Sequence, residues 1–302
     1  MPKDSNLYTE LQIKINPEIE DIVSEFCFEN LPCEGVILAE ETYKDLEMVS
    51  TTEGILKVFL TSKPDDLDVI LNNQRLLLKS RGLSDEELGS WDFVVSDKPN
   101  EDWSRKWKEK WDITRVTDRI VIVPDWLEYS PKKDEIVIRL EPGCAFGTGT
   151  HQTTQLCMKA IEEYMNKGAK VVDIGMGSGI LAICAKKFGA SYVYGCDNDE
   201  TVIDVARENA LKNDVECIFE LNTADKISMK FDFVLANILH NVLAEIMSDL
   251  KNIMNNNAIM VLSGILDEKK SVVYNAIKKC NFELIKETHQ DQWVAIIVRR
   301  VD

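Results

Sequence analysis

Three alternating glycines, Gly175, Gly177 and Gly179, follow an apolar segment that we predict to be a buried strand, Lys170–Ile174. The apolar segment 180–188 predicts a helix, so the glycines lie on the turn at the carboxyl end of a strand, where open α/β sheets bind ligands. A dinucleotide-binding turn usually reads G-x-G-x-x-G to admit a pyrophosphate. This turn is one residue tighter, which suits an adenosyl ligand without phosphate, such as S-adenosylmethionine. The alternative is a plain tight turn in a Rossmann-like domain.

A carboxylate follows the next predicted strand, which covers residues 191–197 and ends in Asp197. It lies roughly 20 residues past the glycine turn, where it can accept hydrogen bonds from both ribose hydroxyls of a nucleoside. This spacing fits NAD and S-adenosylmethionine alike. The alternative is that residues 197–199 only cap the predicted helix Thr201–Lys212. Asp173, just before the glycines, is a further possible cofactor contact.

A second glycine-rich segment, residues 141–154, reads EPGCAFGTGTHQTT and leads into a predicted helix. Its glycines can act as hinges and its threonine hydroxyls as donors or acceptors, so the segment can fold over a ligand. Thr154 is the candidate contact here, with Thr148 and His151 as possible ones. The alternative is a glycine-rich turn with a threonine helix cap. His151 is as able to orient the loop as to move a proton.

An asparagine, Asn237, stands just after the predicted strand 231–236 in the run FDFVLANILH. Its amide oxygen can accept a hydrogen bond from an incoming amine while its amide nitrogen is held by the cofactor or the backbone. The alternative is an ordinary helix-capping asparagine. Ser263 and Gly264, after the next predicted strand, would complete the rim of the site.

Composition excludes several classes of protein. The chain has 302 residues, of which 45% are hydrophobic, enough for two domains. It has no apolar window of 18 residues and no signal-peptide pattern at its start, so we expect a soluble cytoplasmic protein without membrane contact. The eight cysteines form no C-x-x-C pair, and with three histidines they offer no zinc spacing. We therefore predict reduced, buried thiols and no metal.

The net charge of the chain indicates which kinds of macromolecule it can bind. Lys and Arg number 35 against 52 Asp and Glu, a formal net charge of −17, which repels the phosphates that dominate nucleic-acid affinity. No direct nucleic-acid binding is expected, and a basic protein is the better macromolecular partner. Acidity that only aids solubility is the alternative.

The elements that must position these residues fall into two domains. In residues 1–96 the pattern predicts strands over 9–15, 35–40, 54–61 and 90–96, and helices from Asn16 and over 65–80. This βαββαβ order is ferredoxin-like, and nothing in it looks catalytic, so we expect it to bind or position a substrate. Residues 118–302 alternate strands and helices and finish with an antiparallel hairpin over 282–288 and 293–298, which predicts a doubly wound α/β sheet.

A linker helix is predicted between these domains, over residues 97–117. Trp103, Trp107 and Trp111 recur every four residues, which places three indoles along one side of a helix. We expect this stripe to anchor the linker against one or both domains, with direct contact to a substrate as the alternative.

The motifs FGTGTHQTT, VVDIGMGSGILAI, GCDND, ANIL and LSGIL occur in this order. Together they resemble the ribosomal protein L11 methyltransferases (PrmA type), in the class I S-adenosylmethionine-dependent superfamily, and the resemblance covers nearly the whole chain. It implies a Rossmann-like, doubly wound seven-stranded sheet preceded by a ferredoxin-like substrate-recognition domain. Cofactor contacts then fall on Thr154, Gly175, Asp197 and Asn237, with Gly177 in the same turn.

The implied reaction moves methyl groups from S-adenosylmethionine to lysine or N-terminal amines of ribosomal protein L11 and releases S-adenosylhomocysteine. Met176 and His240 depart from the family pattern. Three other functions stay open: methylation of another protein or a small amine, a nicotinamide-dependent oxidation, and a non-catalytic binding module.

Overall fold

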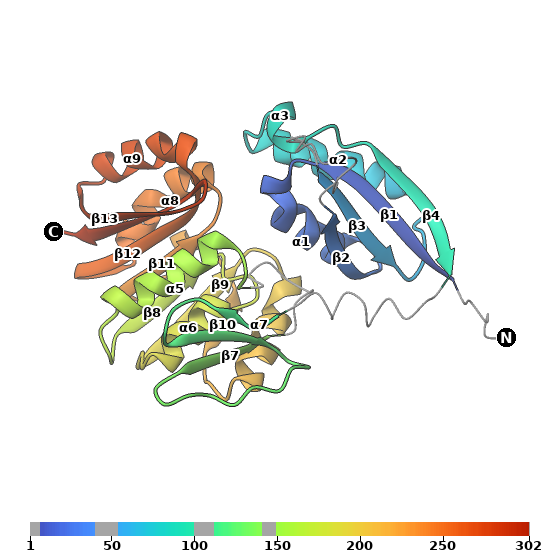
Figure 1. Ribbon diagram of the computed structural model, residues 1–302. Helices are drawn as coiled ribbons and strands as arrows, with labels where there is room; N and C mark the ends of the chain where they lie inside the picture. The colour runs from blue at the N-terminus through green and yellow to red at the C-terminus, as the bar shows by residue number, and fades with distance from the viewer. Residues whose placement is uncertain (1–6, 40–53, 100–111, 141–148, 302) are drawn as a thin grey trace, which may run out of the picture. The chain divides into compact units, whose positions relative to one another are not determined.

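The computed structural model describes residues 7–39, 54–99, 112–140 and 149–301 (Figure 1). The chain divides into two compact units, residues 1–112 with 143–146, and residues 113–142 with 147–302. Trp103, Trp107, Trp111 and Thr148 lie outside the described residues.

The first unit is a four-stranded antiparallel sheet with two main helices. Its strands follow the order β2-β3-β1-β4, and β1 pairs antiparallel with both β3 and β4. The elements are β1 (Leu7–Ile15), α1 (Glu20–Asn30), β2 (Cys33–Ala39), β3 (Gly54–Leu60), α2 (Leu67–Ser80), the short α3 (Asp85–Leu88) and β4 (Phe93–Pro99). The predicted βαββαβ order is confirmed, with α3 as an addition.

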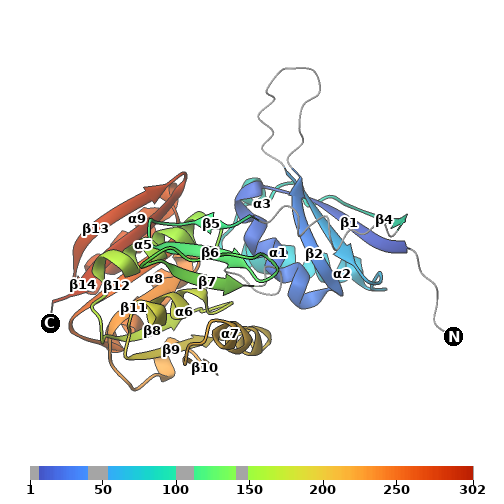
Figure 2. The same ribbon diagram turned by 60° about the horizontal axis from the view of Figure 1, so that its bottom comes forward.

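Alternation along β1 builds the core of this unit. Leu11, Ile13 and Ile15 are fully buried, and they join the same apolar cluster as Leu71 of α2 and Val23 of α1. Both helices therefore pack on one face of the sheet, as Figures 1 and 2 show. The period of two in the sequence specified this face.

The second unit is built on a seven-stranded sheet of order β10-β9-β8-β11-β12-β14-β13. The first five strands are parallel, and β14 runs antiparallel to both of its neighbours. The strands are β8 (Lys170–Ile174), β9 (Tyr192–Asp197), β10 (Ile218–Leu221), β11 (Phe231–Asn237), β12 (Met254–Leu266), β13 (Phe282–Gln290) and β14 (Trp293–Arg300). The predicted doubly wound sheet and its closing hairpin are confirmed.

Helices cover both faces of this sheet. Val172 and Val234 pack in one cluster with residues of α8 and α9, whereas α5 and α6 lie on the opposite face, on the side of Asp173. The helices are α5 (Gln152–Tyr164), α6 (Ile180–Lys187), α7 (Thr201–Lys212), α8 (His240–Asn252) and α9 (Lys270–Lys279). No described helix combines the length and the apolar character needed to cross a bilayer.

A three-stranded sheet that we did not predict precedes α5. It consists of β5 (Thr114–Arg115), β6 (Ile120–Pro124) and β7 (Ile136–Leu140), in the order β5-β6-β7. The ends of the predicted linker helix are therefore wrong: residues 97–99 continue β4, and residues 114–115 form β5. The interior of that prediction, residues 100–111, lies outside the described residues.

Glu135 holds the loop of this small sheet. Its side chain is 3% exposed and pairs with Arg115 Nη2 at 2.8 Å. It also accepts hydrogen bonds from the Tyr129 hydroxyl and the Lys132 backbone N–H, each at 2.7 Å. These donors, the backbone N–H first among them, lower the pKa of Glu135 to about 2.

Replacing Glu135 by Gln should lower the thermal stability at pH 7. The folded-state pKa lies below the ordinary value, so the stabilisation is present above about pH 4.3 and is lost as the pH falls toward 2. Thermal unfolding of wild type and variant should therefore differ at pH 7 and converge near pH 2. The exposed Glu128→Gln is the matched control, and a pH-independent difference for Glu135→Gln would contradict the assignment.

Candidate active site

Three adjacent strands, β9, β8 and β11, end together at the carboxyl edge of the large sheet, and β12 runs beside them past Ser263 to Leu266. Ile174 of β8 stands opposite Cys196 of β9 and Ala236 of β11. Asn237 at the end of β11 stands opposite Ser263 of β12. The glycine turn, Asp197, Asn237 and Ser263 thus lie side by side although they are far apart in the sequence. This convergence of the predicted site residues follows from the parallel register.

The glycines of the turn adopt backbone conformations that side chains resist. Gly175, Gly177 and Gly179 have φ of 68°, 49° and 75°, all in the left-handed region. A Cβ on Gly175 would lie 2.3 Å from Ile238 Cγ2, so this glycine makes room for a protein side chain. The backbone N–H of Gly175 donates a hydrogen bond to Cys196 O at 2.9 Å, which holds the start of the turn against β9.

Met176 points away from the outer surface of this turn. It is 4% exposed, and its sulfur lies 2.7 Å from where a Cβ on Gly195 would stand. The side chain therefore packs against Gly195 in the interior of β9. The departure from the family pattern at this position is accommodated by Gly195.

Asp197 holds the glycine turn from the neighbouring strand. Its carboxylate accepts hydrogen bonds from Gly177 N at 3.0 Å and from Asp199 N at 3.2 Å. Burial raises the pKa of Asp197, and these backbone donors oppose the rise. The contact to the first residue of α7, Thr201 N, comes instead from Asp199 at 2.8 Å. The N-cap of α7 is Glu200, without a side-chain capping bond, so Asp197 does not cap the helix and instead holds the glycine turn.

Asp173 is a buried carboxyl beneath the same turn. It is 1% exposed, and one oxygen accepts a hydrogen bond from Ala182 N at 3.1 Å. The other oxygen, Oδ1, has no hydrogen-bond partner within the described part of the chain. Burial, with a smaller contribution from the charge of Asp197, raises the pKa of Asp173 to about 7. The carboxyl is thus poised to respond to a positive charge brought near it.

Asn237 presents an amide oxygen that no described residue binds. The residue is 6% exposed, and its Nδ2 donates to Thr154 Oγ1 at 3.4 Å. The helix that follows, α8, has Leu239 at its N-cap and no side-chain capping bond, so the capping alternative for Asn237 is wrong. Thr154, fully buried, therefore fixes which way the amide faces.

His151 caps the helix that carries Thr154. Its Nδ1 accepts from Thr153 N at 3.4 Å and lies 2.7 Å from Thr153 Oγ1. Its ring meets the edge of Trp293 with the ring centroids 4.9 Å apart. The cap is thus histidine where the alternative interpretation expected threonine. These contacts favour an orienting role for His151 over proton transfer.

Two contacts of this region were not predicted from the sequence, although Ile238 itself was expected on the cofactor side. Ile238 lies against Gly175, and its backbone oxygen would be 2.5 Å from a Cβ on Gly264, whose φ is 80°. The glycine at position 264, which the structure places inside β12, was the available signal for this close approach. Trp293, on the last strand of the sheet, carries no local signal of its contact with His151.

The polar atoms left over at this edge fit a cationic ligand. Asp173 Oδ1 and Asn237 Oδ1 are both buried acceptors that lack a donor among the described residues, and such atoms are costly unless a ligand satisfies them. S-adenosylmethionine carries an ammonium and a sulfonium, so the residues present fit it. The same acceptors give no preference to the negative pyrophosphate of NAD.

Replacing Asp173 by Asn should raise the free energy of unfolding at pH 8. A folded-state pKa of about 7 exceeds the ordinary value of about 3.9, so folding favours the protonated carboxyl. In the wild type, the free energy of unfolding is therefore not reduced by Asp173 below about pH 4. It falls as the pH rises toward 7, by up to about 1.4 kcal/mol per pH unit. Asparagine can still accept from Ala182 N but does not ionise.

Urea denaturation at pH 5 and pH 8 measures this difference, which should grow with pH. The exposed Asp225→Asn serves as the control. Parallel pH dependences for wild type and Asp173→Asn would show that the buried carboxyl does not titrate as described.

Comparison with known proteins agrees with this geometry. The family model described as ribosomal protein L11 methyltransferase (PrmA) matches residues 7–301. A ribosomal protein L11 methyltransferase of Clostridium botulinum (strain Eklund 17B / Type B) is 38% identical over 249 residues, which cover 82% of this chain and 79% of that protein. One from Listeria monocytogenes serotype 4b is 40% identical over 227 residues, covering 74% and 72%.

A solved structure extends the similarity to three dimensions. The ribosomal protein L11 methylase of Lactobacillus delbrueckii subsp. bulgaricus aligns with a TM-score of 0.61 at 33% identity, covering 64% of this chain and all of that one. Because the family model spans residues 7–301 and these relatives cover most of the sequence, the chain belongs to the ribosomal protein L11 methyltransferase family.

Proposed function

We propose that this chain transfers methyl groups from S-adenosylmethionine to amino groups of ribosomal protein L11, on lysine side chains, the N-terminus or both. The observation that carries the proposal is the buried amide oxygen of Asn237, which lacks a described partner beside the glycine turn. A hydrogen-bond acceptor at this position suits an incoming amine. Family membership supports both the reaction and the substrate.

The cofactor contacts that we propose are Gly175, Gly177, Asp197, Thr154 and Asn237. Asp197 would accept from the ribose hydroxyls, and the backbone of the glycine turn would lie against the adenosyl group. Asp173 is a further candidate because its free oxygen is buried under the turn. For His151 we propose only the orienting role. Thr148, which lies outside the described residues, is a further cofactor contact that we propose from the sequence alone.

The chemistry requires a neutral amine. A lysine with a pKa of about 10.4 must lose its proton, which at pH 7 costs on the order of 4 to 5 kcal/mol. Neutral Asn237 cannot remove that proton. Desolvation beside a positive charge lowers the pKa of the amine, and water takes the proton.

Positioning supplies the rest of the acceleration. Asn237 Oδ1 accepts one N–H of the amine and so orients its lone pair, while the Thr154 hydroxyl holds the amide in that direction. S-adenosylmethionine supplies the methyl group: the amine nitrogen forms the new bond to carbon, the carbon–sulfur bond breaks, and S-adenosylhomocysteine leaves.

We assign recognition of the protein substrate to the N-terminal domain, predicted as residues 1–96 and extended to Pro99 by β4. The methyltransferase domain, predicted as residues 118–302, includes β5 and so begins before Thr114, which shortens the predicted linker 97–117 at both ends. The net charge of −17 favours a basic surface on the substrate. A tethered recognition domain keeps the local concentration of docked substrate high while the presented amine changes. We assign the reaction to the cytoplasm.

Purified L11 and S-adenosylmethionine test the function directly, with methylation followed by mass spectrometry. Asn237→Ala should lower kcat by roughly 10- to 100-fold, because the variant cannot orient the amine. The exposed Asn252→Ala, at the far end of α8, should leave the rate unchanged. Full turnover by Asn237→Ala with unchanged substrate affinity would remove the assignment.

Calorimetric titrations of wild type with S-adenosylmethionine and with NAD complete this test. Binding of NAD alone would overturn the proposed function. Binding of S-adenosylmethionine without methylation of L11 would point to another protein or a small amine as the substrate.

Deleting residues 1–96 should spare S-adenosylmethionine binding and abolish methylation of L11. The second compact unit keeps its own cores, so the truncated protein should remain folded by circular dichroism. Calorimetry and the mass-spectrometric assay measure the two outcomes separately. Methylation of L11 at the full rate by the truncated protein would contradict the recognition role.

A further inference from the structure

The turn of the last hairpin, between β13 and β14, lies against α5 between Gln152 and Lys159. Asp291 Oδ2 accepts from Gln152 Nε2 at 3.2 Å. Gln290 accepts from Lys159 Nζ at 2.8 Å and donates to Gln155 Oε1 at 3.1 Å. Three polar contacts thus join two segments that are more than 130 residues apart in the chain.

Trp293, the first residue of β14, reaches the N-cap of the same helix. It is 7% exposed and packs with Leu156 of α5 and with Ala295. Its ring is nearly perpendicular to that of His151, at 73°. Edge-to-face contacts of this kind have a preferred geometry, so the indole restricts where the imidazole can lie.

The first turn of α5 carries this restriction to the proposed cofactor site. His151 binds Thr153, and Thr153 O accepts from Ser263 Oγ at 3.3 Å. The next residue, Thr154, accepts from Asn237 Nδ2 at 3.4 Å, near the outer limit for a hydrogen bond. A shift of a few tenths of an ångström at His151 would therefore release the amide of Asn237.

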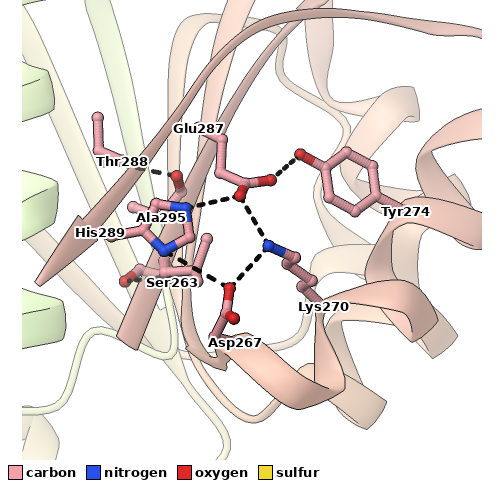
Figure 3. Close-up of polar contacts among 9 residues, drawn as sticks. Ser263, Asp267, Lys270, Tyr274, Glu287, Thr288, His289 and Ala295 are labelled. Carbon is pink, nitrogen blue, oxygen red and sulfur yellow. Dashed lines mark hydrogen bonds and ion pairs between the residues drawn. The ribbon is translucent and has the colours of Figure 1, made fainter. Parts of the chain in front are cut away.

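The hairpin itself is braced by a ring of charged groups shown in Figure 3. Lys270 Nζ lies 2.7 Å from Asp267 Oδ1 and 3.0 Å from Glu287 Oε1. His289 lies 3.5 Å from the same Asp267 oxygen and 2.7 Å from the same Glu287 oxygen, and the Tyr274 hydroxyl donates to Glu287. Asp267 N also donates to Gln292 O in the hairpin turn, at 2.8 Å.

The arrangement of this ring does not suit a metal ion. Asp267, Glu287 and His289 bring possible ligand atoms within 4.8 Å of one another. The ammonium of Lys270 already lies between the two carboxylates, where it would repel a cation. Its role is to hold β13 and α9 together behind the turn that meets α5.

We propose that Trp293 is a positioning residue for the cofactor site, acting through His151 on the first turn of α5. The indole holds the imidazole that caps the helix, and the capped turn places Thr154 against Asn237. This inference rests on the proposed function, because its readout is the affinity for S-adenosylmethionine. Wild-type titration tests the function, and only the variants below test the role of Trp293.

A double-mutant cycle between Trp293→Leu and His151→Asn tests the proposal, with the Kd for S-adenosylmethionine measured by calorimetry. Asparagine keeps a helix-capping oxygen but loses the ring contact. Each single change should raise the Kd by roughly tenfold. The Kd of the double variant should exceed that of either single variant by no more than about threefold, because the two changes break the same contact. Trp293→Phe, which keeps an aromatic edge, should recover most of the affinity.

Leu284→Ala, on the exposed side of the same hairpin, is the matched control and should leave the Kd unchanged. A merely structural role would lower the melting temperature of Trp293→Leu without changing its Kd, and that result would overturn the proposal. The proposal would also be overturned if the Kd of the double variant rose by the product of the two single effects, since the two residues would then act independently. If Trp293→Leu fails to fold, an unchanged Kd in His151→Asn alone would overturn it equally.

Discussion

The close approach of Ile238 to two glycines governs how the strand ends meet at the active edge. Its side chain would clash with any Cβ on Gly175, and its backbone oxygen with any Cβ on Gly264. Ile238 N also bonds Ser263 O at 3.2 Å, so the peptide after Asn237 is held between β8 and β12. The direction of the Asn237 side chain, and with it the proposed amine contact, depends on this packing.

The edge that results holds two buried oxygen atoms, Asp173 Oδ1 and Asn237 Oδ1, that have no hydrogen-bond donor among the described residues. Burial raises the pKa of both Asp173 and Asp197, which means that the fold gives up stability at neutral pH to keep carboxyls there. Such a cost is common where a protein binds charge, because the groups are arranged for a ligand and not for the empty fold. A cationic cofactor returns part of that stability on binding.

Much of the fold was predictable because the period of apolar residues is local information. The glycine spacing, Asp197 and Asn237 could be placed at one edge since parallel strands of a doubly wound sheet end together. In the sheet β5-β6-β7, the two residues of β5 are too few to show a period, whereas β6 and β7 are apolar runs of five residues that could have been assigned as strands. The histidine cap of α5 and its contact with Trp293 could not be predicted, because they depend on a pairing of segments 142 residues apart that no local pattern encodes.

The antiparallel strand β14 lies between β12 and β13, both of which precede it in the chain. During synthesis β12 therefore emerges from the ribosome with one edge unpaired and stays so until β14 follows. An unpaired apolar edge is a template for joining other chains. Nascent chains that stall between β12 and Trp293 would expose that edge, and the pairing of β14 with β12 then covers it.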